Sequence, residues 1–370
     1  MVPALQGVGG LLRLKASQAR RHYAVERRKV IVKLIVQIPC LNEEATLPLV
    51  LESIPKKIDG IDELEVLVID DGSTDRTVEI ARELGVHHVI SHTTRMGLAR
   101  SFRDGVDFAL AHGADIVVNT DGDNQYPQAR IPDLVAPILA GRADIVIGDR
   151  QTHTIEHFSA FKKVMQRFGS WVVNRAAGTK LPDAASGFRA YSRYSLYRLN
   201  IVTQFSYTME TIIQAGNKSL AIASVEIDTN PKTRESRLFS NMFEHMARSG
   251  QAILRSYIMF KPWSLFLSMM VFFGVLGLIP FVRYAILLAQ GDQGNHYQSL
   301  MLGTLLLIGS GLSLAIGVLS DLAKSNRILN EDQLYRIKEQ QYGPAVPAAT
   351  AARQRQEQAP KRRRASSQSG

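Results

Sequence analysis

The feature that most constrains the fold is a regular alternation of strand-like and helix-like segments across residues 30–230. Runs of mostly β-branched apolar residues, typical of buried strands, recur at 30–38, 64–69, 86–90, 116–119 and 145–147. Helical patterns follow Asn42, begin again near Thr74, and recur at about 98–112 and 131–140. Strands that alternate with helices predict an α/β fold, with a mainly parallel sheet covered on both faces.

Acidic residues follow four of these strands. They are Glu43 and Glu44, Asp70 and Asp71, Asp121 and Asp123, and Asp149. Ligands of such sheets bind beyond the carboxyl ends of the strands, so these carboxylates are expected to share one edge, where they would repel each other without a cation or a hydrogen-bonding ligand. The Asp121-Gly122-Asp123 spacing suits a hard divalent cation that bridges diphosphate oxygens. We therefore predict a metal site at Asp121 and Asp123.

Two uncharged segments are unlike the sequence of a soluble domain. Pro262 to Val282 and Ser299 to Leu319 each hold 21 residues without a charge. At 1.5 Å per residue, each reaches roughly 31 Å, which matches the hydrocarbon core of a bilayer. Two core helices of a soluble protein are the alternative, but two adjacent segments of this length favour transmembrane helices. Basic residues flank the pair, whereas the loop between them holds only Arg283, so both termini are expected to face the cytoplasm.

The net charge of +10 does not predict a nucleic-acid partner, because it is concentrated in the tails. Residues 1–29 carry +6 and residues 343–370 carry +5, which leaves about −1 for the body between them. The N-terminal segment has no uninterrupted apolar stretch of the signal-peptide kind, so the body is expected to stay in the cytosol. The 343–370 segment has almost no apolar residues beyond alanine and is predicted to be a disordered basic tail.

The segment before the first apolar span is amphipathic. From Phe239 to Phe260, apolar residues recur at helical spacing, which is typical of an interfacial helix in the headgroup plane or of a helix packed on the preceding domain. The predicted organisation is a basic extension (1–29), an α/β domain (30–238), interfacial helices (239–261), two transmembrane helices (262–320), a cytosolic helical segment (321–342) and the basic tail (343–370).

Four motifs carry a resemblance to a known family. In chain order they read IPCLNEE, VIDDGSTDRT, TDGDNQYP and DAASGFR, between Ile38 and Arg189. Over about residues 30–237 the chain resembles inverting family 2 glycosyltransferases with a GT-A fold, which is a Rossmann-like α/β fold. It is most similar to polyprenyl-phosphate sugar synthases of the dolichol-phosphate mannose synthase type. The paired apolar segments resemble the membrane-anchored branch of that group.

The resemblance implies a set of site residues. A nucleotide site is expected at Pro39, Leu41, Asn42, Glu43, Asp70, Asp71, Gly97 and Asp121. Mg²⁺ or Mn²⁺ is expected on the diphosphate at Asp121, Asp123 and Gln125. The implied partners are a nucleotide-sugar donor, a polyprenyl-phosphate acceptor and the bacterial plasma membrane or an equivalent one.

Arginines are the candidates for binding phosphates, because guanidinium groups pair with them in bidentate fashion. We predict catalytic roles for Arg150, Asp183 and Arg189, and an acceptor-phosphate site at Arg189, Arg234, Ser236 and Arg237. Asp183 either serves as a base or orients Arg189. The chain departs from the family at Arg95, where many members have Asn, and at Arg234 to Arg237, where Gly-x-Ser-Lys is frequent.

The sequence leaves several points open. A transferase acting on a lipid or glycan hydroxyl is the alternative function, and a non-catalytic membrane scaffold is a third. Intact Asp121, Asp123 and Gln125 favour an enzyme. The sugar, the nucleotide, the prenyl length and the oligomeric state, a homo-oligomer included, are not fixed by the sequence.

Overall fold

The computed structural model describes residues 31–151, 160–202, 207–231, 262–291, 294 and 297–358. The predictions for residues 1–29 and 239–261, and those for Arg234, Ser236 and Arg237, lie outside the described residues.

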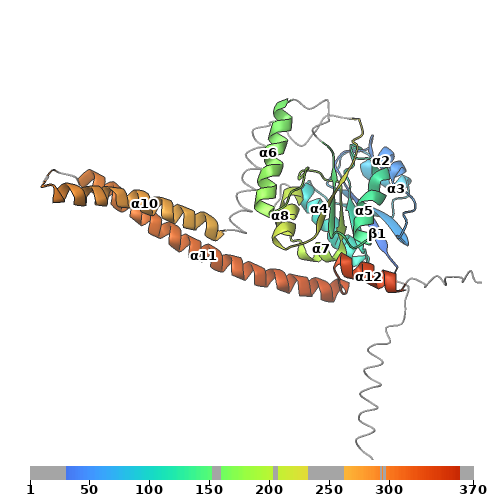
Figure 1. Ribbon diagram of the computed structural model, residues 1–370. Helices are drawn as coiled ribbons and strands as arrows, with labels where there is room; N and C mark the ends of the chain where they lie inside the picture. Colours follow the sequence, from blue (N-terminus) through green and yellow to red (C-terminus); the bar gives the residue numbers. More distant parts are fainter. Residues whose placement is uncertain are drawn as a thin grey trace, which may run out of the picture.

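One sheet organises the described part of the chain before the apolar helices (Figure 1). Its seven strands follow the order β3-β2-β1-β4-β6-β5-β7. They are β1 (Lys33–Cys40), β2 (Glu63–Asp70), β3 (His88–Ser91), β4 (Ile116–Asn119), β5 (Ile145–Asp149), β6 (Arg189–Ser192) and β7 (Ile222–Glu226). Only β6 runs antiparallel to its neighbours, β4 and β5. The predicted mainly parallel sheet is thereby confirmed.

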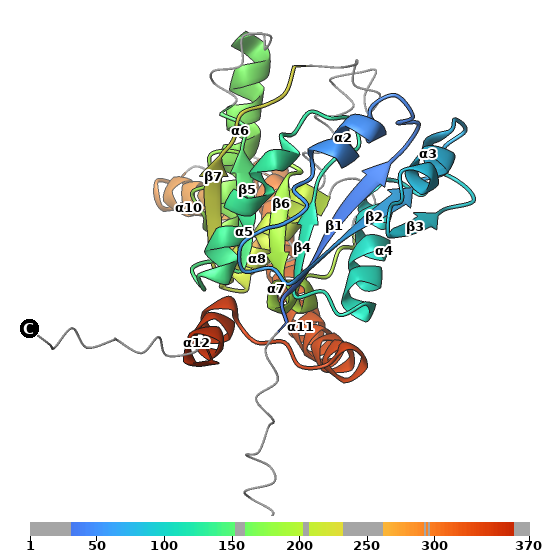
Figure 2. The ribbon, with the colours of Figure 1, turned by 90° about the vertical axis from the view of Figure 1, so that its right-hand side faces the viewer.

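Helices cover both faces of the sheet (Figure 2). One face packs against α4 (Leu98–Ala111), α6 (Ala160–Ala177), α7 (Arg193–Arg198) and α8 (Tyr207–Asn217). The other packs against α2 (Leu47–Ser53), α3 (Thr77–Glu83) and α5 (Ile131–Leu139), which follows the short 3₁₀ helix η1 (Gln128–Arg130). Neighbouring residues of β1 enter opposite cores: Ile35 joins the first, whereas Leu34 and Val36 join the second.

Two long apolar helices follow the sheet domain. They are α10 (Pro262–Ala289) and α11 (Tyr297–Tyr342), and both are long and apolar enough to cross a membrane. Their side chains are mostly exposed, which is not expected of the core helices of a soluble protein. Close contact between them depends on small residues, since a Cβ at Gly303 would lie 2.8 Å from the Phe281 ring.

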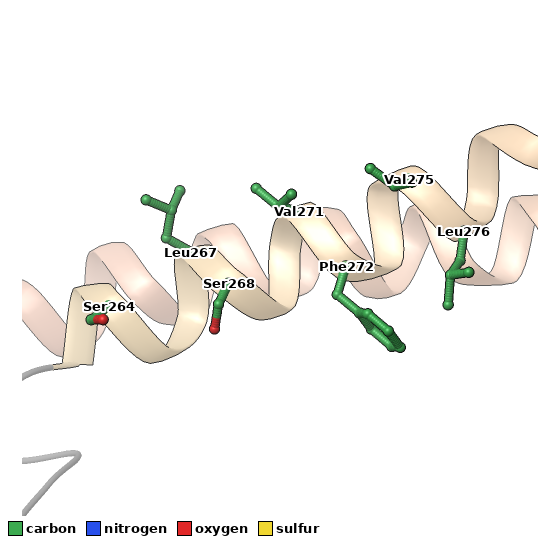
Figure 3. Close-up of a pocket in the computed structure, with 7 residues that line it drawn as sticks. All are labelled: Ser264, Leu267, Ser268, Val271, Phe272, Val275 and Leu276. Carbon is green, nitrogen blue, oxygen red and sulfur yellow. The ribbon is translucent and has the colours of Figure 1, made fainter.

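A shallow apolar groove lies along the exposed side of α10 (Figure 3). Leu267, Val271 and Phe272 contribute to it, with Ser264 and Ser268 at one end. The groove lies on a candidate membrane span and away from the sheet, as expected of a lipid-facing surface.

The helix α11 does not end where its apolar segment ends. It continues beneath the sheet domain, where Lys338 Nζ donates to the carbonyls of Leu196 (3.2 Å) and Leu199 (3.4 Å). The predicted helical segment at 321–342 is therefore present as the continuation of α11.

The structure differs from the predicted disordered tail over residues 343–358. A further helix, α12 (Ala348–Gln358), packs on α5 at the side of the domain opposite α2 (Figure 2). Its Ala348 N–H donates to Asp144 Oδ1 at 3.1 Å, and Arg355 Nη2 donates to the Leu139 carbonyl at 2.9 Å. The physical reason is that alanines can lie directly against Gly141, a close contact that a search for apolar residues does not detect.

Candidate active site

The candidate site lies at the carboxyl ends of the parallel strands β1, β2, β4 and β5, which together form one edge of the sheet. The register sets Cys40 beside Asp70 and Gln37 beside Asn119, so β1, β2 and β4 end close together, and it sets Asn119 beside Arg189. Because β6 is antiparallel, its first residue reaches the same edge. The four acidic loops of the sequence therefore meet there, together with the loop that leads into β6.

The loops after β1 and β2 are joined by hydrogen bonds. Asn42 adopts a left-handed backbone (φ 55°), and its side-chain oxygen accepts the Thr74 N–H at 2.8 Å. The Asn42 N–H donates to Ser73 Oγ, and the Glu43 N–H donates to Thr77 Oγ1, each at 2.8 Å. Asn42 thus holds the two loops together, and it places Glu43 next to the end of β2.

Asp71 organises the loop before α4. Its carboxylate accepts the N–H groups of Met96 and Gly97 at 2.8 and 2.9 Å. His92 Nδ1 lies 3.0 Å from the same carboxylate, and His92 Nε2 lies 3.2 Å from Asp104. Gly97 has φ 94°, a conformation that favours glycine. The structure therefore brings the predicted nucleotide residues Asp71 and Gly97 together; their role stays a prediction.

Glycines allow the acidic loop after β4 to pack tightly. A Cβ at Gly122 would lie 2.8 Å from Cys40 Sγ and 3.2 Å from Glu43 Cγ. A Cβ at Gly187, in the loop before β6, would lie 3.1 Å from Asp121 Oδ2. Asp121 is consequently enclosed between the end of β1 and the loop before β6.

The electrostatics of this loop suit a divalent cation. Burial, followed by the charges of Asp123 and Glu43, raises the pKa of Asp121 to about 7, although Arg150 opposes the shift. Burial also raises the pKa of the Cys40 thiol, so that group stays protonated. No cluster of three His, Cys, Asp or Glu side chains forms a metal site in the described ranges. A cation on Asp121, Asp123 and Gln125 would thus need substrate oxygens, and Mg²⁺ usually takes such oxygens from phosphates.

Arg150 and Asp183 form an ion pair at the site, in which Asp183 is buried and Arg150 is partly exposed. Arg150 Nε donates to Asp183 Oδ2 at 2.7 Å, and Arg150 Nη2 donates to Oδ1 at 3.0 Å. Burial alone would raise the pKa of Asp183, but the charge and hydrogen bonds of Arg150 hold it below its ordinary value. The partner of Asp183 is therefore Arg150 and not Arg189, which differs from one of the two predicted roles.

Arg189 lies beneath the site instead of facing it. The side chain is completely buried, and it donates to the carbonyls of Ser186 (2.7 Å), Ala184 (3.0 Å) and Thr208 (2.8 Å). It also donates to Thr211 Oγ1 at 2.8 Å. Four of its five N–H donors are thereby used. This arrangement contradicts the predicted phosphate contact, because a phosphate could reach Arg189 only if these bonds broke.

Two residues near the site, Tyr126 and His92, were missed by the sequence reasoning. The Tyr126 hydroxyl accepts the Gly187 N–H at 2.8 Å, and His92 supports Asp71. Tyr126 belongs to the TDGDNQYP motif, so its position was the available signal. Glu210 is buried, and it accepts the Val202 N–H at 3.1 Å, which indicates a structural role.

A family model described as glycosyl transferase family 2 matches residues 35–199. A dolichyl-phosphate hexose transferase of Haloferax volcanii is 30% identical over 223 residues, which cover 60% of this chain and 92% of that relative. This chain belongs to glycosyl transferase family 2. The predicted GT-A class is confirmed by this membership together with the mainly parallel sheet of seven strands.

Two more relatives and a solved structure are similar to this chain. A polyprenol monophosphomannose synthase of Mycolicibacterium smegmatis is 26% identical, covering 53% of this chain and 76% of its own. An undecaprenyl-phosphate mannosyltransferase of Micrococcus luteus is 29% identical, covering 46% and 70%. Among solved structures, a glucosyl-3-phosphoglycerate synthase of Mycobacterium tuberculosis with Mn²⁺, uridine diphosphate and phosphoglyceric acid has a TM-score of 0.48 at 24% identity, covering 61% and 78%.

Proposed function

We propose that this glycosyltransferase moves a sugar from a UDP- or GDP-sugar to polyprenyl phosphate, with inversion at the sugar carbon C1. The observation that carries the proposal is the meeting, at one sheet edge, of the Asp121–Asp123 loop and the Arg150–Asp183 pair. The acceptor class is supported by the three curated relatives above, whose names all describe sugar transferases acting on polyprenyl carriers.

The donor nucleotide is proposed to bind on the joined loops after β1 and β2. Pro39 lies near the end of β1, Leu41 and Glu43 lie in the loop after it, and Asp71 and Gly97 meet beside the second loop. The carboxylates of Glu43 and Asp71 can accept hydrogen bonds from ribose or base donors. The cross-loop bonds fix both loops before a ligand arrives, which lowers the entropic cost of binding.

The leaving diphosphate is proposed to lie over the acidic loop. Asp121, Asp123 and Gln125 would hold Mg²⁺ or Mn²⁺ there, and the cation would offset the charge that develops on the leaving oxygen. Arg150 contributes a second positive charge near this loop. Its charge favours the ionised form of Asp121 and so opposes the rise in the pKa of that group. A fixed charge at this position stabilises the leaving group without reorganisation.

The acceptor phosphate attacks C1 from the face opposite the diphosphate. A bond forms between a phosphate oxygen and C1 while the bond from C1 to the diphosphate oxygen breaks. A phosphate monoester has a second pKa near ~6 and is largely a dianion at pH 7, so no base is required. Asp183, ionised and bound to Arg150, is better suited to orient that arginine than to remove a proton.

The membrane supplies the acceptor. We propose that α10 and the apolar part of α11 span it, with the site and both termini in the cytoplasm, because basic residues flank the pair. Arg234, Ser236 and Arg237 are proposed to bind the acceptor phosphate, and residues 239–261 to lie in the headgroup plane. Both assignments depend on residue type and position in the sequence.

A donor panel tests the proposal. Purified full-length protein is supplied with polyprenyl phosphate and a series of UDP- and GDP-sugars, and nucleotide release is measured with Mg²⁺ or Mn²⁺. One donor should be turned over, and EDTA should stop the reaction until metal is restored. Asp123→Ala should abolish turnover, whereas Asp133→Ala, an exposed aspartate on α5, should not. Full activity in EDTA would remove the metal from the proposal.

A further inference from the structure

A line of buried polar side chains runs from the centre of the sheet to the loop before β6. Gln37 Nε2, on β1, donates to Asn119 Oδ1 at 3.0 Å. Asn119 Nδ2, at the end of β4, donates to the Tyr207 hydroxyl at 2.8 Å and to the Gly187 carbonyl at 3.0 Å. Gln37, Asn119 and Tyr207 are all fully buried.

The line ends on Gly187, whose backbone carbonyl and N–H are both hydrogen-bonded. The Gly187 carbonyl accepts from Asn119 and also from the Tyr207 hydroxyl at 3.4 Å, while the Gly187 N–H donates to the Tyr126 hydroxyl at 2.8 Å. The carbonyls of Ala184 and Ser186 are held by Arg189. Hydrogen bonds therefore hold the backbone of the loop that begins with Asp183 at Ala184, Ser186 and Gly187.

These contacts connect the acidic loop after β4 with the loop before β6. Asn119 and Tyr126 lie at either end of the acidic loop, and Gly187 lies directly against Asp121. At the other end of its loop, Asp183 holds Arg150. A shift of Gly187 would therefore move the Arg150–Asp183 pair relative to Asp121.

The hydroxyls are not needed to fill the core. The Tyr207 ring stacks on Phe102 with ring centres 4.0 Å apart, and the Tyr126 ring stacks on Phe188 at 5.3 Å. Phenylalanine would keep both contacts. Both hydroxyls are hydrogen-bonded, and buried polar groups bonded in this way specify one arrangement of the elements they join.

We infer that Asn119, Tyr126 and Tyr207 are positioning residues, which fix the backbone of Gly187 and so hold the Arg150–Asp183 pair at its place beside Asp121. The inference rests on the proposed function for its catalytic consequence. The proposed base and ribose site does not depend on these hydrogen bonds, because the loops after β1 and β2 are joined separately. Loss of a positioning bond should accordingly lower kcat much more than it weakens donor binding.

Tyrosine-to-phenylalanine variants test the inference in the full-length protein. Tyr126→Phe and Tyr207→Phe each remove one hydroxyl. A displacement near 1 Å in a catalytic site costs on the order of 100-fold, so kcat should fall between about 10- and 100-fold. The KM for the donor and the Kd for the nucleoside diphosphate with Mn²⁺ should change much less than kcat does.

Tyr191→Phe is the matched control. Tyr191 is as buried as Tyr207 and also packs on Phe102, with ring centres 5.6 Å apart. Within the described ranges, its hydroxyl has no hydrogen-bond partner. This variant should keep the wild-type kcat. Equal losses in all three variants would overturn the inference, since they would show a general sensitivity of the core.

Hydrogen–deuterium exchange gives a readout that does not require an acceptor. Peptides covering residues 183–190 should exchange faster in Tyr126→Phe than in the wild type or Tyr191→Phe, because the Gly187 N–H loses its acceptor. If the wild type transfers nothing to polyprenyl phosphate and exchange still rises, the proposed function fails and the positioning inference stands. Unchanged exchange together with wild-type kcat in Tyr126→Phe and Tyr207→Phe would overturn the inference itself.

Discussion

Removing Arg150 should expose how much the site depends on its ion pair. In Arg150→Gln, the Asp183 carboxylate, whose side chain is 1% exposed, loses both of its guanidinium bonds. Breaking a buried pair from one side costs about 3–5 kcal/mol, because a buried charge is left uncompensated. For a domain of this size, 1 kcal/mol corresponds to about 2–4 °C, so the melting temperature should fall by roughly 6–20 °C.

Two further variants separate the ion pair from other effects. Asp183→Asn removes the carboxylate charge that Arg150→Gln leaves without a partner. The loss in the free energy of unfolding of the double variant Arg150→Gln/Asp183→Asn should therefore be at least about 1.5 kcal/mol smaller than the sum of the two single losses. Arg336→Gln is the exposed control. Its pair with Asp332 has a similar distance of 2.9 Å but exposed side chains, and such pairs contribute about 0–1 kcal/mol.

The pH dependence has a definite sign. In the wild type the pKa of Asp183 is lowered, so its contribution to stability is complete above the unfolded value of about 3.9 and is lost below it. Without Arg150, burial raises the pKa, and protonation relieves the buried charge. The gap in melting temperature between wild type and Arg150→Gln should therefore narrow as the pH falls from 7 toward 4. Thermal unfolding in detergent measures it; a constant gap, or additive single losses, would refute the reasoning.

Three other predictions concern packing and topology. Gly122→Ala should lower turnover at least about tenfold, because the new Cβ would lie 2.8 Å from Cys40 Sγ. Adding Cys40→Ala should restore part of the turnover, and the absence of any rescue in a turnover assay would contradict the packing account. Gly141→Leu should release α12 and speed tryptic cleavage at Arg353, because Gly141 has φ 70° and the new Cβ would lie 2.7 Å from Ala349 Cα. Gly85→Ala should not have this effect, because Gly85 has a similar φ but no atom within 4 Å of the new Cβ. In Cys40→Ser cells, an impermeant maleimide should label Gln293→Cys and spare Ser367→Cys, and the reverse pattern would invert the proposed orientation.

The sequence predicted most of the sheet and the acidic part of the site. Long β-branched runs make strands such as β2 recognisable, and acidic residues directly after them must share one edge of a parallel sheet. The strand β6 could not be found in this way, because its four residues, Arg189 to Ser192, include no β-branched residue. Its antiparallel direction is what brings the loop before it, with Asp183, to that edge.

The partners of individual charges could not be predicted. Guanidinium groups pair well with phosphates, so the sequence reasoning favoured a phosphate contact for Arg189, whereas the folded chain surrounds it with carbonyl oxygens. Carbonyls carry no sequence signal, because every residue has one. The packing of α12 was missed for a related reason, since its buried residues Ala348 and Ala352 contribute close contacts instead of a large apolar face.

The central claim is that the acceptor is a lipid phosphate, and a comparison of two acceptors of equal chain length tests it most directly. Purified full-length protein receives the donor identified by the panel and either polyprenyl monophosphate or the corresponding polyprenol, and the product is identified by mass spectrometry. A site built for the anion leaves its cations unpaired with the alcohol, and such sites reject analogues by on the order of 10⁴-fold. The account predicts a polyprenyl-phosphate monosaccharide from the phosphate and no product from the alcohol. Comparable rates with both would contradict it, and would assign the protein to transferases that act on hydroxyl groups.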